Sequence, residues 1–281
     1  MGSFGGYVSL VRPNVCLLAI FGVVVGYLLS PGSGFPAAYD VKLLLAVAVA
    51  FLACGAGNVI NDYFDYKIDK TNAPNRPIPS GAVKRKNALA LYFSLSISSL
   101  ALAFSVSMYF FWIALANVAV LSAYGWNLKR SIYMKNSAVS WLSSSSFLAG
   151  GFILNTSIAP AVLIVFMVSF LGTFSREVFK DVQDLKGDRR QKVRTFATVF
   201  GRPAATNIAS MVAVTALLSV VSPYLFGVYP IAYVLAASPC ILLGALAVSN
   251  RKDAKKSQRL LKASMYCFTV ALILTVIMGV V

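Results

Sequence analysis

Seven of the nine Asp and Glu residues in this chain of 281 residues fall in two sets with the same internal spacing. The sets are Asn58, Asp62, Asp65 and Asp69 in NVINDYFDYKIDK, and Glu177, Asp181, Asp184 and Asp188 in REVFKDVQDLKGD. Offsets of zero, four, seven and eleven residues keep side chains on one face of an α-helix with about 3.6 residues per turn. The spacing therefore predicts two helical faces that each carry a row of carboxylates.

A row of carboxylates on one helical face is unfavourable, because the like charges repel one another. A hard divalent cation relieves this repulsion, and a ligand set of oxygen atoms favours Mg²⁺ over zinc or copper. We therefore predict metal-binding roles for Asp62, Asp65, Asp69, Asp181, Asp184 and Asp188. Of these, Asp62 and Asp181 are also predicted to be catalytic. The competing interpretation is a pair of solvated helix ends without a ligand.

Mg²⁺ usually completes its coordination shell with water and with phosphate oxygens of a substrate. The pattern thus predicts a phosphorylated substrate, and basic residues follow both acidic groups. Arg76, in NRPIPSG, is predicted to bind phosphate because a guanidinium donates two parallel hydrogen bonds. Pro77, Pro79 and Gly81 should hold its loop in a fixed turn. A metal ion on a diphosphate would stabilise the charge that develops on the leaving group.

Hydrophobic residues make up 58% of the chain and form long uninterrupted runs. A bilayer core requires about 20 apolar residues per helix. We predict an all-α polytopic membrane protein, a single domain over residues 1–281 with nine transmembrane helices around a central lipid-accessible cavity. The predicted spans cover roughly residues 14–30, 41–61, 88–107, 109–126, 137–154, 159–177, 204–222, 229–249 and 262–280.

The formal net charge of +16 is predicted to lie on one side of the membrane. Apart from Arg12 and Lys42, every Lys and Arg falls in the segments 61–86, 127–136, 176–202 and 250–262. The positive-inside rule then places the N-terminus, these segments and the active site on the cytoplasmic side of a multi-pass protein of the cell membrane. Membrane lipids are expected around it. Nucleic acid is not an expected partner, because no soluble domain is present to bind it, and nothing indicates an obligatory protein partner.

The two acidic motifs, at the ends of the second and sixth spans, resemble those of the UbiA superfamily of intramembrane prenyltransferases. The resemblance covers essentially the whole chain. It implies that Asn58 and the aspartates line a site for Mg²⁺ and diphosphate, with Asp69 at its edge. It also implies catalytic roles for Tyr124 and Lys129, in the loop YGWNLKR after the fourth span. These two residues are one position further apart than in many members that prenylate aromatic rings.

Within the superfamily, REVFKDVQDLKGD, YGWNLK and the short N-terminal segment are most similar to archaeal enzymes that form the second ether bond of membrane lipids. This resemblance implies geranylgeranyl diphosphate as the donor and geranylgeranylglyceryl phosphate as the acceptor. A phosphorylated acceptor requires a second anion site. The candidates for it are Arg12, Lys180, Lys192 and Arg194.

The sequence is also compatible with three alternative functions. The first is a prenyltransferase of quinone biosynthesis with an aromatic acceptor. The second is a transporter or cation channel whose acidic groups bind ions; it is disfavoured because both groups lie on the same predicted side, whereas ion pathways need sites near the midplane or on both faces. The third is a structural membrane protein with an acidic surface, in which Asp62→Ala and Asp181→Ala would change nothing measurable.

Overall fold

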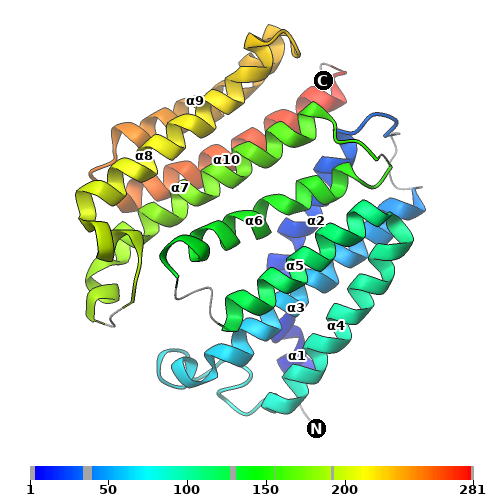
Figure 1. Ribbon diagram of the computed structural model, residues 1–281, viewed down its shortest axis with the longest axis vertical. Coiled ribbons are helices and arrows are strands. Elements are labelled where there is room, and N and C mark those ends of the chain that lie inside the picture. The colour runs from blue at the N-terminus through cyan, green and yellow to red at the C-terminus, as the bar shows by residue number, and fades with distance from the viewer. Residues whose placement is uncertain (1–3, 34–39, 127–130, 155, 191–192, 280–281) are drawn as a thin grey trace. The chain divides into compact units, whose positions relative to one another are not determined.

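Figure 1 shows a chain built of α-helices alone over the residues that this computed structural model describes, which are 4–33, 40–126, 131–154, 156–190 and 193–279. The helices are α1 (Phe4–Val11), α2 (Pro13–Leu28), α3 (Val41–Asn72), α4 (Arg85–Val106), α5 (Met108–Trp126), α6 (Ile132–Gly151), α7 (Pro160–Arg190), α8 (Phe196–Leu225), α9 (Ile231–Ser249) and α10 (Ala254–Ile277). The predicted all-α class is confirmed.

Within the described ranges, seven helices are long and apolar enough to cross a membrane: α3, α4, α5, α7, α8, α9 and α10. Helices α1 and α2 pass the same test together, although they are bent by 41° where they meet, and they make an eighth if the bent pair is counted as one span. Helix α6 covers most of the predicted span 137–154 but is more polar. Its sequence, IYMKNSAVSWLSSSSFLAGG, contains Lys135, Asn136 and a run of four consecutive serines.

The structure divides into two compact units, and the first consists of Met1–Lys129 and Ser145–Ile158. Its core lies between α2, α3, α4 and α5 and includes Val23, Tyr27, Val49, Val106 and Phe110. A second cluster joins α1, α3 and α4 and includes Leu10, Val59, Ile60, Val83 and Tyr92. This cluster fixes the part of α3 that carries the first acidic group.

Helix α2 approaches the last turns of α6 closely in the first unit. A Cβ atom added to Gly26 would overlap the backbone carbonyl of Phe147, and one added to Gly150 would overlap the carbonyl of Val23. Small residues allow two membrane helices to approach until their backbones touch, which replaces the hydrophobic effect as the source of attraction. These two glycines therefore determine the spacing between α2 and α6.

The second unit consists of Arg130–Ser144 and Ala159–Val281. Its core lies between α7, α8, α9 and α10 and includes Val178, Phe179, Ala205, Ala209, Ala247 and Leu261. Helix α8 begins with a capping box, in which the Thr195 side chain accepts from the backbone N–H of Thr198 and the Thr198 side chain accepts from that of Thr195. The helix bends at Gly201, whose φ of 82° is a conformation that favours glycine.

Both acidic groups lie on helices that continue beyond the predicted ends of the membrane spans. The predicted segments 61–86 and 176–202 begin as helix, because α3 runs to Asn72 and α7 to Arg190. Asp40 starts α3 by accepting hydrogen bonds from the N–H groups of Lys42 and Leu43. Pro74 follows soon after the last turn. Since each group is on one continuous helix, the prediction of a shared helical face is confirmed.

Candidate active site

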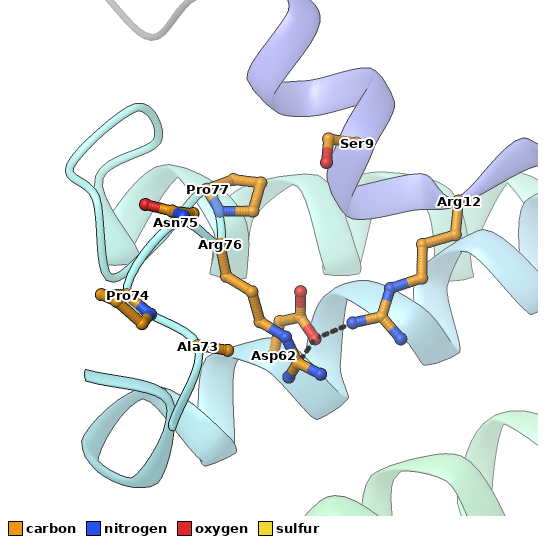
Figure 2. Close-up of a pocket in the computed structure, with 8 residues that line it drawn as sticks. All are labelled: Ser9, Arg12, Asp62, Ala73, Pro74, Asn75, Arg76 and Pro77. Carbon is orange, nitrogen blue, oxygen red and sulfur yellow. Dashed lines mark hydrogen bonds and ion pairs between the residues drawn. The ribbon is translucent and has the colours of Figure 1, made fainter. Parts of the chain in front are cut away.

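The first aspartate of the first group, Asp62, is buried against two guanidinium groups (Figure 2). Asp62 lies in α3 with 1% of its surface exposed. The Nη2 atom of Arg12 lies 2.5 Å from Oδ1 of Asp62, and Nη1 of Arg76 lies 3.6 Å from the same oxygen. Arg12 lies between α1 and α2, and Arg76 lies in the loop after α3. Two segments far apart in the sequence thus supply positive charge to one buried carboxylate.

Arg76 also binds the last aspartate of the first group. Its Nη1 atom donates to Oδ2 of Asp69 at 2.7 Å, and Asp69 is buried. Burial opposes the charge on Arg76, but the hydrogen bond to Asp69 and the neighbouring carboxylates raise its pKa above the ordinary value. Asp65, half-buried one turn from Asp62, is one of these neighbours. A permanently charged guanidinium therefore joins the two buried carboxylates, and Asp69 belongs to the same ion-paired cluster as Asp62.

Arg12 reaches Asp62 because the N-terminal helix is broken at that residue. Arg12 has a φ of 54°, in the left-handed region that residues other than glycine rarely adopt. Pro13 begins α2, and its ring nitrogen has no N–H to continue the hydrogen bonds of α1. The carbonyl of Val11 instead accepts a hydrogen bond of 2.8 Å from Nδ2 of Asn58. Asn58, which is predicted to bind substrate, therefore contacts the chain at the helix break where Arg12 lies.

A cavity of about 610 Å³ lies beside Asp62 (Figure 2). Its lining consists of Ser9, Arg12, Asp62, Ala73, Pro74, Asn75, Arg76 and Pro77. The loop that carries Arg76 is closed by a backbone hydrogen bond from Ser80 to Arg76 and by Gly81, whose φ is 80°. The lining contains two guanidinium groups and one carboxylate. It is therefore net positive and suits an anion such as a phosphate.

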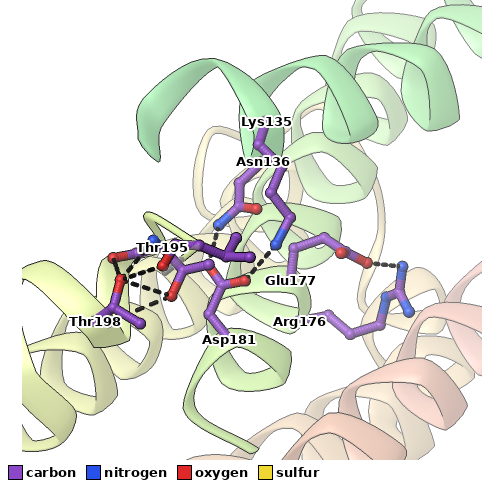
Figure 3. Close-up of polar contacts among 8 residues, drawn as sticks. Lys135, Asn136, Arg176, Glu177, Asp181, Thr195 and Thr198 are labelled. Carbon is purple, nitrogen blue, oxygen red and sulfur yellow. Dashed lines mark hydrogen bonds and ion pairs between the residues drawn. The ribbon is translucent and has the colours of Figure 1, made fainter. Parts of the chain in front are cut away.

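The first aspartate of the second group, Asp181, is buried against the beginning of α6 (Figure 3). Asp181 lies in α7 with 2% of its surface exposed. Nζ of Lys135 donates to Oδ1 of Asp181 at 2.6 Å, and Nδ2 of Asn136 donates to Oδ2 at 3.0 Å. Two consecutive residues of α6 thus each bind one oxygen of the carboxylate. The side chains behind Asp181 on α7, Val178 and Val182, belong to the apolar core of the unit.

The remaining acidic residues of the second group differ in exposure. Glu177 is buried and pairs with Arg176 at 2.5 Å (Figure 3). Asp184 is exposed and Asp188 is half-buried. The helical row therefore passes from a buried, ion-paired end at Glu177 and Asp181 to a solvated end, as expected for a helix that leaves an apolar environment.

Lys135 and Asn136 were not identified as site residues from the sequence. The available signal was a Lys-Asn pair at the beginning of an otherwise apolar run, where a charge is unfavourable unless it has a partner. The spacing of the aspartates carried no information about these two residues, because their contact with Asp181 joins different helices.

The other predicted site residues are exposed, half-buried or outside the described residues. Lys180 and Arg194 are exposed. Tyr124 lies half-buried in the last turn of α5. Lys129 and Lys192 lie outside the described residues. The contacts described for the candidate site are therefore mainly those of Asp62 and Asp181.

Comparisons with known proteins identify the family of the chain. A model of the UbiA prenyltransferase family matches residues 19–273. The chain belongs to the UbiA prenyltransferase family. Digeranylgeranylglyceryl phosphate synthase from Methanococcoides burtonii is 36% identical to this UbiA family member over 267 residues, which cover 92% of this chain and 95% of that enzyme.

Solved structures of UbiA proteins have the same fold. A structure described as one of digeranylgeranylglyceryl phosphate synthase in membranes is 31% identical and covers 97% of this chain and 98% of its own, with a TM-score of 0.87. A UbiA homologue from Archaeoglobus fulgidus, bound to GPP and Mg²⁺, is 14% identical with a TM-score of 0.67, and covers 96% of this chain and 99% of its own. At this low identity, the likeness to the Archaeoglobus fulgidus protein shows a shared fold and nothing further.

The donor atoms of this UbiA family member fit Mg²⁺ bound together with a phosphorylated ligand. Over the described part of the chain, no three His, Cys, Asp or Glu side chains lie close enough to form a metal cage. Each acidic group instead offers carboxylate oxygens, and the first aspartate of each group, Asp62 or Asp181, is buried. Mg²⁺ is usually bound through one or two carboxylates, with water and substrate phosphate completing its shell. The carboxylate oxygens of the two acidic groups thus match the needs of Mg²⁺ better than those of zinc.

Proposed function

We propose that this chain transfers a geranylgeranyl group from geranylgeranyl diphosphate to the hydroxyl of geranylgeranylglyceryl phosphate. This reaction forms the second ether bond of archaeal membrane lipids. The observation that carries the proposal is the similarity, over nearly the full length of both chains, to an enzyme named digeranylgeranylglyceryl phosphate synthase. The cavity lined by Arg12 and Arg76 supports it, because the donor is a polyanion.

The reaction breaks the bond between C1 of the prenyl chain and the diphosphate oxygen, and the electron pair leaves with the diphosphate. The acceptor hydroxyl oxygen bonds to C1 and releases its proton. Positive charges fixed before the reaction lower the barrier, since negative charge develops on the leaving group. We assign this role to Arg12, Arg76 and Lys135. An apolar membrane environment would exclude the water that competes with the acceptor.

Each acidic group is proposed to hold Mg²⁺ through its first aspartate, Asp62 or Asp181. The surrounding carboxylates in this proposal are Asp65, Asp69, Asp184 and Asp188. When bound, Mg²⁺ neutralises charge on the departing diphosphate. Tyr124 and Lys129 are proposed to act at the donor, and Lys180, Lys192 and Arg194 are candidates for the acceptor phosphate.

Product analysis tests the substrate pair. Purified protein with Mg²⁺ and geranylgeranyl diphosphate would be offered geranylgeranylglyceryl phosphate and, separately, an aromatic acid. We expect diphosphate release and a doubly alkylated glyceryl phosphate, identified by mass spectrometry. Product from the aromatic acid alone would overturn the proposal and favour a prenyltransferase of quinone biosynthesis.

Conservative substitutions test the two buried aspartates. Asp62→Asn and Asp181→Asn keep the size of each side chain but remove the charge, and we expect turnover to fall by about 10²-fold or more, as for the loss of a group that stabilises charge in the transition state. Asp253→Asn is the matched control. Asp253 is an exposed acid that caps α10, a position that Asn also suits. Two folded variants with wild-type turnover would overturn the metal assignment.

We propose that α6 completes a set of nine spans and that the N-terminus and the basic segments face the cytoplasm. In α6, Ser140 and Ser144 donate their hydroxyls to backbone carbonyls one turn earlier, which lowers the penalty for placing serine in a membrane. Single-cysteine variants Ser80→Cys and Gly227→Cys, made in a background without native cysteines, test the orientation. In intact cells a membrane-impermeant maleimide should label the second and spare the first. The reverse pattern would refute it.

A further inference from the structure

Asn136 binds one oxygen of Asp181, and its other polar side-chain atom is unpaired over the part of the chain that the structure describes. Its side chain is fully buried, and its Nδ2 atom donates to Oδ2 of Asp181 at 3.0 Å. Its Oδ1 atom is also buried and has no hydrogen-bond partner among the described residues. An unpaired buried acceptor is unfavourable, so its retention requires a reason.

The orientation of the Asn136 amide follows from its neighbours. Rotating the amide by half a turn would place Oδ1 against the carboxylate of Asp181, with two acceptors facing each other. Asp181 thus keeps the amide nitrogen toward itself, and in Figure 3 the amide oxygen points away from it, on the side of Lys135. Lys135 donates to the other oxygen of Asp181, and Ser140 donates to the backbone carbonyl of Asn136. The unpaired oxygen therefore has a fixed direction beside the carboxylate.

We propose that Asn136 is a positioning residue for the divalent cation on Asp181. Its Nδ2 atom orients the carboxylate, and its Oδ1 atom accepts a hydrogen bond from a water of the cation's hydration shell. Mg²⁺ loses its waters reluctantly, so waters remain that need acceptors around a protein site. Groups that hydrogen-bond to a metal ligand typically change metal affinity by about 10–100-fold when they are removed. This inference rests on the proposed function, because it takes Asp181 as a metal ligand.

Two substitutions separate the hydrogen-bonding role from packing. Asn136→Leu has a similar volume but neither donor nor acceptor. Asn136→Asp keeps acceptor oxygens and adds charge, but it cannot donate to an ionised Asp181. The proposal predicts that the cation binds more tightly to N136D than to N136L. Packing alone predicts that N136L is the better tolerated of the two and that neither changes the affinity for the cation.

The assay uses Mn²⁺ as a spectroscopic probe for the full chain in detergent, with inorganic pyrophosphate present. Free Mn²⁺ is measured by electron paramagnetic resonance, and thermal unfolding is followed for every variant. We expect N136L to weaken Mn²⁺ binding by about 10–100-fold. The Mg²⁺ concentration for half-maximal turnover should rise by the same factor, while the KM for the lipid acceptor is unchanged. Ser144→Ala, two turns along α6 and equally buried, is the control and should bind Mn²⁺ like the wild type.

A folded N136L variant with wild-type Mn²⁺ affinity would overturn this inference, as would N136D binding Mn²⁺ no better than N136L. Failure of the proposed function has a different result. In that case the wild type would form no glyceryl ether product, although the order of Mn²⁺ affinities among the variants could still be measured.

Discussion

Replacing Arg76 by Gln tests whether the cavity beside Asp62 binds the diphosphate of the donor. Arg76 donates to Asp69 at 2.7 Å and lies 3.6 Å from Asp62. Gln retains a polar end of moderate length, but it removes the positive charge that the two buried carboxylates share. We expect a higher KM for geranylgeranyl diphosphate and a lower stability.

The size of both effects follows from the exposure of the groups. A hydrogen bond to a charged group contributes about 1.5–3 kcal/mol, and about 1.4 kcal/mol corresponds to a factor of ten, so KM should rise by about 10–100-fold. Removing one partner of a fully buried ion pair costs about 3–5 kcal/mol, whereas an exposed pair contributes about 0–1 kcal/mol. The Arg76 side chain is 38% exposed and Asp62 retains Arg12, so we expect a loss of about 1–3 kcal/mol in the free energy of unfolding.

The assay measures diphosphate release over a range of donor concentrations, together with thermal unfolding in detergent. Arg85→Gln is the matched control, because the Arg85 guanidinium lies over the ring of Tyr63, 4.2 Å from its centroid. Its KM should stay within about twofold of the wild type, as for a surface substitution that costs about 0.5 kcal/mol or less. Arg76→Lys should recover part of the lost affinity, since Lys restores the charge without the two-pronged geometry. A folded R76Q variant with an unchanged KM would refute the assignment of the cavity to the diphosphate.

Three further predictions concern the helix break, the close helix contact and the metal. Arg12→Gly and Arg12→Ala both lose the ion pair with Asp62, but glycine adopts a φ of 54° freely. The Gly variant should therefore be more stable than the Ala variant by about 1–2 kcal/mol in thermal unfolding. Equal stability of the two variants would argue against backbone strain at Arg12. Gly26→Ala should destabilise the protein by about 1–3 kcal/mol, because its Cβ overlaps the Phe147 carbonyl. The control Gly5→Ala, whose Cβ meets open space, should be neutral or mildly stabilising by about 0.5–1 kcal/mol. A Gly26→Ala variant that unfolds at the wild-type temperature would contradict the close contact. Chelation of divalent cations should stop turnover and added Mg²⁺ should restore it, and turnover that persists in excess chelator would exclude Mg²⁺ dependence.

The rows of aspartate were predictable because helix periodicity is a local property. Asn58, Asp62 and Asp69 lie on one helix, α3, and the second group lies on α7, as their offsets indicated. The predicted ends of the spans were less informative. Hydropathy locates the boundary of the apolar region, but a helix continues as long as its backbone hydrogen bonds do. Both helices therefore extend through their acidic motifs to Asn72 and Arg190.

The broken helix at the N-terminus shows a second limit of prediction from the sequence. The predicted span 14–30 begins close to the observed start of α2 at Pro13, and proline favours the first position of a helix. Nothing local indicated that residues 4–11 form a helix of their own, or that Arg12 would adopt a left-handed conformation between the two. That conformation persists because tertiary contacts hold it, with Asn58 on the Val11 carbonyl and Asp62 on the guanidinium.

The two acidic groups have the same spacing but different partners, and the difference shows which information lies outside the pattern. Asp62 binds an arginine 50 residues earlier in the chain, and Asp181 binds a lysine 46 residues earlier. The chain has 25 Lys and Arg residues, and most lie on the same predicted side, so composition could not select Arg12 and Lys135 among them. Their common feature is position, because each stands at or just before the first turn of a largely apolar helix. A cation there is unfavourable unless a buried anion pairs with it. Lys42, Arg85 and Lys255 also stand at helix beginnings, so this position alone would not have selected Arg12 and Lys135 as the partners of the buried aspartates.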